Sequence, residues 1–199
     1  MSDGHGHAAV IDPVEPAIET VYNGKLAMWL FLCSEVMFFS GLLGAYITLR
    51  LGNEKLFVES QKHLHDNVKI AAFNTMLLIT SSLTMALAVV RGQEKKTGAQ
   101  RMFLLATAVM GTLFICLKMY EYSQKFADHI YPSSGIFWAF YFSMTGVHAF
   151  HIICGIFPML GLWWYAKDRD VSCETEMVGL YWHFVDLVWI FLFPLLYLI

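Results

Sequence analysis

Several titratable side chains of this chain occur inside or beside long apolar stretches. They are Glu35, Glu121, His148, His151, His183 and Asp186. A charged group within an apolar stretch that crosses a membrane costs several kcal/mol unless it is paired, neutralised or hydrated. Such residues therefore indicate places where protons are handled, metals are bound or helices are held together.

The histidines have the spacing of a helical face. Thr145, His148 and His151 are three residues apart, as are His183 and Asp186, so a helix brings each set to one side. One chemistry that fits is a metal or haem site, with the three histidines as ligands and Asp186 orienting them. The other is a metal-free polar network that ties helices together or holds lipid head groups. A single HxxH pair does not decide between them.

The carboxyl groups have two different settings. Glu35 lies about ten residues into the first apolar stretch, near mid-membrane by the rise of a helix. A carboxyl at that depth is expected to be neutral at pH 7 unless a donor or cation faces it. It either handles protons, anchors a contact between helices, or bonds to a neighbouring helix in its protonated form. Glu121 follows the third apolar stretch, between Tyr120 and Tyr122, and is expected near a membrane face.

The composition indicates a membrane protein. The chain has 199 residues, of which 57% are hydrophobic and only 15% charged. Soluble domains are about 45–50% apolar and about 25% charged. The net charge of -3 argues against nucleic acid as a partner. The four cysteines form no CxxC pair and give no disulfide-rich pattern.

Five transmembrane helices are expected to position these residues. The predicted spans are about 26–49, 68–90, 102–120, 136–165 and 177–199, each long enough to cross a bilayer at about 20 residues. The predicted fold is thus an all-α, polytopic membrane bundle over residues 25–199, preceded by a flexible polar tail at 1–24. Several aromatic residues near span ends, among them Tyr181 and Tyr197, are expected to form an interfacial belt.

Basic residues in the links between spans suggest an orientation. With Lys118 and Lys125 counted among the links, seven basic residues fall on the N-terminal side and six on the other. The densest cluster, RGQEKKTGAQR at 91–101, lies on the N-terminal side. We therefore expect the N-terminus in the cytoplasm and the C-terminus outside.

The five spans also carry a family resemblance, in the following segments. They are WLFLCSEVMFFSGLLGAYITLR at 29–50, FNTMLLITSSLT at 73–84, GTLFICLKMYEYSQKF at 111–126, SGIFWAFYFSMTGVHAFHIICGIF at 134–157 and YWHFVDLVWIFLFPLLY at 181–197. In this order they resemble subunit III of the haem-copper cytochrome oxidases. The TGxHxxHxxxG core and the YWHFVDxVWxFLF run are its most specific motifs. The chain resembles the short, five-helix bacterial form, which lacks the first helix pair of longer members.

The resemblance implies a non-catalytic subunit of a respiratory oxidase in the bacterial cytoplasmic membrane. It would contact subunit I and subunit II, with haems and copper in those partners and no redox metal or catalytic residue in this chain. In the family, phospholipid lies in a cleft near the counterpart of Glu35, between the first helix pair and the other helices. Because this chain lacks that pair, one wall of the cleft is expected to be missing or to be supplied by another subunit. Glu35 and Glu121 would be buried carboxyls that handle protons or contact lipid. The expected polar network comprises Asn74, Thr145, His148, His151, Trp182, His183, Asp186 and Trp189.

The resemblance leaves two alternatives for the electron donor of the oxidase, cytochrome c and a quinol. The Glu in CSEVMFF, the FNT run and the YWHFVD run favour the cytochrome c oxidase branch over the related quinol oxidases. Two other classes are alternatives to the family as a whole. One is a free-standing membrane haem or metal enzyme, and the other is a small transporter that uses Glu35 and the histidines as a relay. The sequence leaves open whether the oxidase joins a larger respiratory supercomplex.

Overall fold

Helices make up nearly all of the part of the chain that the structure describes. The structure is a computed structural model that describes residues 16–62, 64 and 68–198, with side chains from residue 23 onward. The helices are α1 (Pro16–Gly52), α2 (Glu54–Lys62), α3 (Val68–Gln93), α4 (Thr97–Ala127), α5 (Ile136–Tyr165) and α6 (Ser172–Phe193), with a short 3-10 turn η2 (Pro132–Ser134) and a π-helical turn η3 (Pro194–Leu198).

Five of these helices are long and apolar enough to cross a membrane. They comprise residues Asn23–Gly52 of α1, then α3, α4 and α5, and finally α6 together with η3. A membrane interior offers no water to backbone N–H and C=O groups, so an apolar segment satisfies them within its own helix. The prediction of an all-α fold with five long apolar helices is confirmed. The orientation across the membrane stays a prediction.

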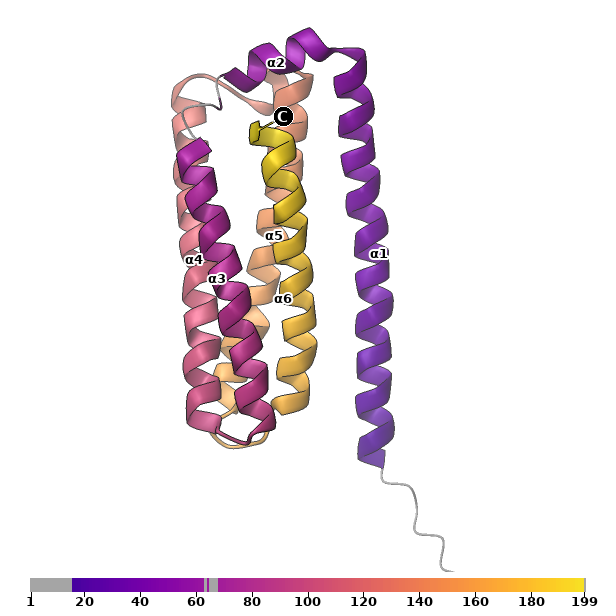
Figure 1. Ribbon diagram of the computed structural model, residues 1–199, viewed down its shortest axis with the longest axis vertical. Helices are drawn as coiled ribbons and strands as arrows, with labels where there is room; N and C mark the ends of the chain where they lie inside the picture. The colour runs from indigo at the N-terminus through magenta and orange to yellow at the C-terminus, as the bar shows by residue number, and fades with distance from the viewer. Residues whose placement is uncertain (1–15, 63, 65–67, 199) are drawn as a thin grey trace, which may run out of the picture.

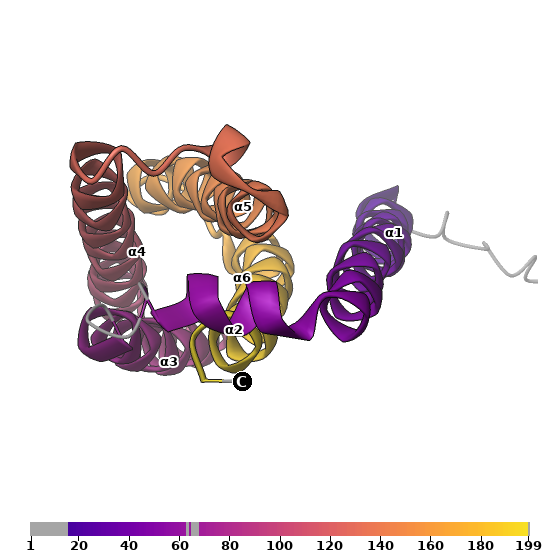
Figure 2. The same ribbon diagram turned by 90° about the horizontal axis from the view of Figure 1, so that it is seen from above.

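Four helices form a closed ring, and α1 stands outside it. Viewed from above, α3, α4, α5 and α6 follow one another around the ring, each packing on the next, and α1 runs alongside α6 (Figure 2). Helix α2 crosses one end of the molecule and connects α1 with the ring (Figure 1). Only 11% of the residues in the apolar stretch of α1 are buried, against 44% for α6 with η3. Helix α1 therefore belongs to the edge of the molecule.

The ring closes tightly because two glycines make room for one tryptophan. The indole of Trp182, on α6, is fully buried. A Cβ at Gly111 of α4 would lie 2.6 Å from that ring, and one at Gly155 of α5 would lie 2.9 Å from it. Real Cβ atoms do not approach so closely, so only glycine fits at both positions. The small residues thus bring three helices together around one large side chain.

Several boundaries differ from the predictions. Helix α1 begins at Pro16, so residues 16–24 of the predicted tail are helical, while residues 1–15 lie outside the described residues. Proline suits the first turn of a helix because its missing N–H needs no partner there. Helix α2 occupies part of the predicted link 50–67, and buries Phe57. Helix α4 extends to Ala127, beyond the predicted end at 120.

The aromatic belt is only partly as predicted. Trp164 and Tyr165 are exposed at the end of α5, as residues at a membrane interface would be. Tyr181 and Tyr197 are instead buried, with 8% and 4% of their surfaces exposed. The prediction was wrong for these two because position near a span end does not reveal which way a side chain points. Both direct their hydroxyl groups to partners within the bundle.

Candidate functional site

Glu35 joins α1 to the ring through His151 on α5. The His151 Nε2 atom lies 3.0 Å from the Glu35 carboxyl Oε2, and the two side chains are only 18% and 12% exposed for Glu35 and His151 respectively. Phe39, also on α1, packs edge-on against the His151 ring at a centroid distance of 5.2 Å. Of the roles predicted for Glu35, the anchor between helices matches this geometry.

The hydrogen bonds of His151 define where one proton lies. Its Nδ1 atom is 2.8 Å from the carbonyl oxygen of Val147, which can only accept, so Nδ1 carries a hydrogen. If the ring is neutral, Nε2 accepts and the Glu35 carboxyl must be protonated. If the ring is charged, Nε2 donates to a carboxylate. In either state the pair holds a single proton between Glu35 and Nε2 and has no net charge.

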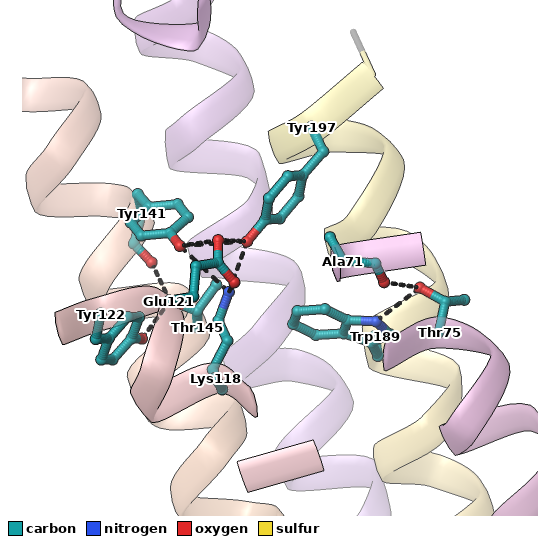
Figure 3. Close-up of polar contacts among 9 residues, drawn as sticks. All are labelled: Ala71, Thr75, Lys118, Glu121, Tyr122, Tyr141, Thr145, Trp189 and Tyr197. Atoms are coloured by element: carbon teal, nitrogen blue, oxygen red, sulfur yellow. Dashed lines mark hydrogen bonds and ion pairs between the residues drawn. The ribbon is translucent and has the colours of Figure 1, made fainter. Parts of the chain in front are cut away.

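A second titratable cluster, the Lys118 cluster, is buried at one end of the ring (Figure 3). It consists of Lys118 and Glu121 of α4, Tyr141 of α5 and Tyr197 of η3. The Lys118 Nζ atom lies 3.0 Å from Glu121 Oε2, 3.2 Å from the Tyr141 hydroxyl and 2.6 Å from the Tyr197 hydroxyl. Both tyrosines donate to Glu121 Oε1, over 2.7 and 2.6 Å. Glu121 thus lies within α4, not after its span.

The hydrogen bonds of the Lys118 cluster form a closed set. An ammonium group has three donors, and Lys118 directs one to each of its three oxygen partners. Aromatic rings surround the ammonium, including those of Tyr122 and Trp189 at 5.6 and 5.2 Å from their centroids. Each phenol accepts from Lys118 and donates to the carboxylate. A cluster whose donors are all used suits the fastening of helices more than the passage of protons.

Thr145 bonds to the next turn of α4, beside the Lys118 cluster. Its hydroxyl donates to the Tyr141 carbonyl at 2.6 Å, so the Tyr122 hydroxyl must donate to Thr145, at 2.5 Å. A threonine hydroxyl also bonds to Trp189 of α6, in this case from α3. Thr75 donates to the Ala71 carbonyl and accepts from the Trp189 indole at 3.0 Å (Figure 3).

Three of the predicted polar residues point into the ring interior. Asn74, His148 and Asp186 are almost wholly buried. The His148 ring stacks on Trp189 with a centroid distance of 5.0 Å, and Phe114 meets it edge-on. Within the described part of the chain, the side-chain polar atoms of Asn74 and His148 have no hydrogen-bond partner, and the Asp186 carboxyl lies near the Ser82 hydroxyl without a hydrogen bond of good geometry.

The three histidines face three different neighbours. His148 stacks on Trp189, and His151 meets Glu35. His183 lies 2.6 Å from the Ser82 hydroxyl of α3. The structure therefore does not bring them together as one ligand set. The Trp182 indole donates to the Ser81 hydroxyl at 3.0 Å, so both tryptophans of the predicted network bond to α3.

An apolar groove separates α1 from α6 beyond the Glu35 contact. Its volume is about 260 Å³. Val36, Phe39 and Leu43 line one wall, and Phe184 and Phe191 contribute to the other. The polar contacts between α1 and the rest of the chain lie outside this groove. One is the pair formed by the Lys25 ammonium and the Glu176 carboxylate, 2.9 Å apart.

Lys118, Tyr141 and Tyr197 were not predicted as site residues. Lys118 was counted among the basic residues of the links, although it falls within the predicted span 102–120. A usable signal was present, since Lys118 and Glu121 are three residues apart and face the same side of a helix. The tyrosine partners come from distant elements, so their part in the cluster depends on tertiary structure.

Comparison with known proteins identifies the family. The family model described as "Cytochrome c oxidase subunit III" matches residues 17–199. A "Probable quinol oxidase subunit 3" of Staphylococcus epidermidis is 29% identical over 182 residues, which cover 88% of each chain. Proteins of the same description from Staphylococcus haemolyticus and Staphylococcus aureus are 27% and 26% identical over the same share. With a match over almost its whole length and five long apolar helices, the chain belongs to the cytochrome c oxidase subunit III family, in its five-helix form.

Proposed function

We propose that this chain is a non-catalytic subunit that stabilises the core subunit I of a respiratory haem-copper oxidase, next to subunit II, in the bacterial cytoplasmic membrane. The observation that carries the proposal is the outer face of α1. Trp29, Leu30, Met37 and Phe38 are all more than half exposed on this helix. An apolar face of this kind can bury against another membrane subunit, with close packing as the driving force.

Lipid binding is a second part of the proposal. The groove between α1 and α6 is lined almost entirely by apolar side chains, from residues 36–43 of α1 and 184–191 of α6. Such a lining suits the acyl chains of phospholipids. Glu35 and His151 lie at one end of the groove, where Phe39 contacts the His151 ring. We propose that bound phospholipid fills this groove and that the Glu35 pair keeps its two walls together.

The third part concerns orientation and proton uptake. Lys118 and Lys125 are buried in α4, so they drop out of the count of basic residues in links. Seven basic residues on the N-terminal side then compare with four on the other side. This difference supports an N-terminus in the cytoplasm. We propose that the polar cytoplasmic surface keeps proton uptake into subunit I fast, since charged surfaces concentrate protons near a channel mouth.

The electron donor is either cytochrome c or a quinol. The runs CSEVMFF, FNT and YWHFVD favour cytochrome c, and we propose it as the donor. Quinol is the second candidate because three relatives at 26–29% identity are described as quinol oxidase subunits. The donor is expected to bind to other subunits. Oxidation of reduced cytochrome c and of a quinol by the same purified complex distinguishes the two.

The proposal is tested by purification with and without this chain. We expect the chain to co-purify in mild detergent with a haem-bearing subunit. We expect oxidase without the chain to lose activity sooner during turnover and to slow at lower pH than the complete complex. Full activity, full lifetime and an unchanged pH profile without the chain would contradict the proposal. Re-addition of the purified chain is the control for damage during preparation.

The two alternative classes predict different results from the chain alone. A free-standing haem enzyme would give a Soret band in the isolated polypeptide. A transporter would give ion flux in liposomes that contain only this chain. We expect neither signal, because the Lys118 cluster uses its donors internally and the three histidines face different neighbours. Either signal would overturn the assignment of a supporting role.

A further inference from the structure

The turn η3 offers backbone acceptors to the helices around it. The last carbonyl groups of a helix have no partner within the helix. In η3 the carbonyl of Leu195 lies 3.4 Å from the Tyr46 hydroxyl and 3.5 Å from the Arg50 guanidinium, both on α1. The Leu196 carbonyl accepts from the Gln61 amide of α2 at 2.9 Å. Side chains of α1 and α2 thus satisfy the end of α6.

The same turn is fastened to the ring on its other side. The Tyr197 hydroxyl lies 2.6 Å from Lys118 Nζ and 2.6 Å from Glu121 Oε1, both on α4. The Tyr197 side chain is 4% exposed, so these bonds lie in a dry setting. Hydrogen bonds to charged groups in such surroundings are stronger than those between neutral groups. The Lys118 cluster therefore holds η3 in place.

Near this end of the molecule, helix α1 also packs through Tyr46, whose ring meets Phe57 of α2 and Phe140 of α5 edge-on. Its contacts with Glu176 and His151 lie toward the opposite end and the middle of the helix. The pair between Lys25 and Glu176 is more than one-third exposed on each side, and pairs of this kind contribute little. The apolar groove lies between Glu35 and Tyr46 in the direction of η3. The position of this half of α1 thus depends on η3, on α2 and on the contact between Tyr46 and Phe140 of α5, and η3 supplies the hydrogen-bond acceptors among them.

We propose that η3 is a docking site for α1 and α2, and that it fixes how far α1 stands from the ring. Loss of the η3 contacts lets the η3 end of α1 swing outward and widens the groove. Tyr197 and Gln61 act as positioning residues, one on each side of the turn. The inference concerns how the chain holds its own helices, so it stands apart from the proposed role in an oxidase.

The test measures the distance between α1 and the ring. Leu51, at the η3 end of α1, and Cys116 on α4 are both exposed, so the full chain in lipid nanodiscs can carry spin labels at Leu51→Cys and at Cys116, with Cys33, Cys154 and Cys173 changed to serine. Pulsed electron resonance then gives the distribution of distances. We expect Gln61→Leu to raise the ratio of long to short distances about fivefold, as expected for loss of one hydrogen bond. Tyr197→Phe removes the bonds to both Lys118 and Glu121, so we expect it to raise the ratio further.

The matched controls are Gln93→Leu and Tyr120→Phe, which make the same changes at exposed positions. These should leave the distribution as in the parent chain. Unchanged distributions in both Gln61→Leu and Tyr197→Phe would overturn the inference, as would equal broadening in the controls. If Tyr197→Phe does not fold, Gln61→Leu decides alone, because Gln61 lies on the outer helix α2 and outside the ring.

Discussion

The ammonium of Lys118 lies 3.0 Å from the carboxylate of Glu121, and the two side chains are 2% and 0% exposed, respectively. Removing one member of a buried ion pair leaves the other charge without compensation, which costs about 3–5 kcal/mol. Replacing both members by neutral groups of similar volume costs much less. The two residues therefore have to be tested together as well as singly.

We expect Lys118→Met and Glu121→Gln each to lower the free energy of unfolding by about 3–5 kcal/mol. The double variant should lose less free energy of unfolding than the two single variants lose together. Unfolding of the purified chain in mixed micelles, followed by circular dichroism, gives these values. Losses that add without coupling would contradict the closed set of hydrogen bonds described above.

The pair of Glu35 and His151 gives a prediction about charge. Because the pair holds one proton and no net charge, a glutamine can donate an amide hydrogen to His151 Nε2. We expect Glu35→Gln to assemble with the partner subunits at the level of the parent chain. Glu35→Leu should assemble less, since an unsatisfied ring nitrogen costs about 1–3 kcal/mol.

The measurement for Glu35 is the yield of the chain that co-purifies with its partners in mild detergent. Glu59→Gln, at an exposed position on α2, is the matched control. If Glu35→Gln assembles as poorly as Glu35→Leu, the negative charge itself is required and the neutral pairing is wrong.

Trp182 gives a prediction about close packing. Gly111→Ala and Gly155→Ala each place a methyl group against the Trp182 indole. We expect each to lower stability by about 1–3 kcal/mol, the usual cost of overpacking a filled core. The displaced indole should also lose its hydrogen bond to Ser81, which shifts its fluorescence. Gly161→Ala has open space around its Cβ and should leave both measurements unchanged.

The link between α5 and α6 gives a prediction about pH. Hydrogen bonds from the Ser172 hydroxyl and backbone N–H hold the pKa of Asp170 below its usual value. A lowered folded-state pKa stabilises the link above the ordinary aspartate pKa of about 3.9, and this contribution is lost as pH falls through the folded value. We expect the protection factor of the Ser172 amide, which is its exchange rate relative to the intrinsic rate at the same pH, to fall only in that acidic range. In Asp170→Asn the exchange should show no such step, and a step that persists would assign it to another group.

The sequence predicted the helices well because the signal for a membrane span is local. Long apolar runs must form helices in lipid, whatever they pack against. The same local signal did not predict how far a helix extends where its next residues are polar and face the interior of the ring. Lys118 and Glu121 look like the end of a span in sequence, but the ring interior supplies their partners. Helix α2 was missed because its nine residues are mostly polar and lie across the ends of the spans.

Side-chain pairing was less predictable than helix position. The sequence singled out Glu35, His148, His151 and Asp186, yet it could not say that only Glu35 and His151 would meet. Tyr197 was expected at a membrane surface and instead completes the Lys118 cluster. Such pairings depend on how helices rotate against one another, and on contacts between residues far apart in the chain.

The order in which the Lys118 cluster is built follows from its position along the chain. Lys118 and Glu121 are synthesised together on α4, but Tyr141 and Tyr197 leave the ribosome later, in that order. When α4 is made, Lys118 and Glu121 are therefore present before the two tyrosines that bond to them. The cluster closes when Tyr197 arrives, and at that moment η3 also presents its carbonyls to α1 and α2. Helix α1 thus gains the backbone acceptors of η3 only after α6 has been inserted.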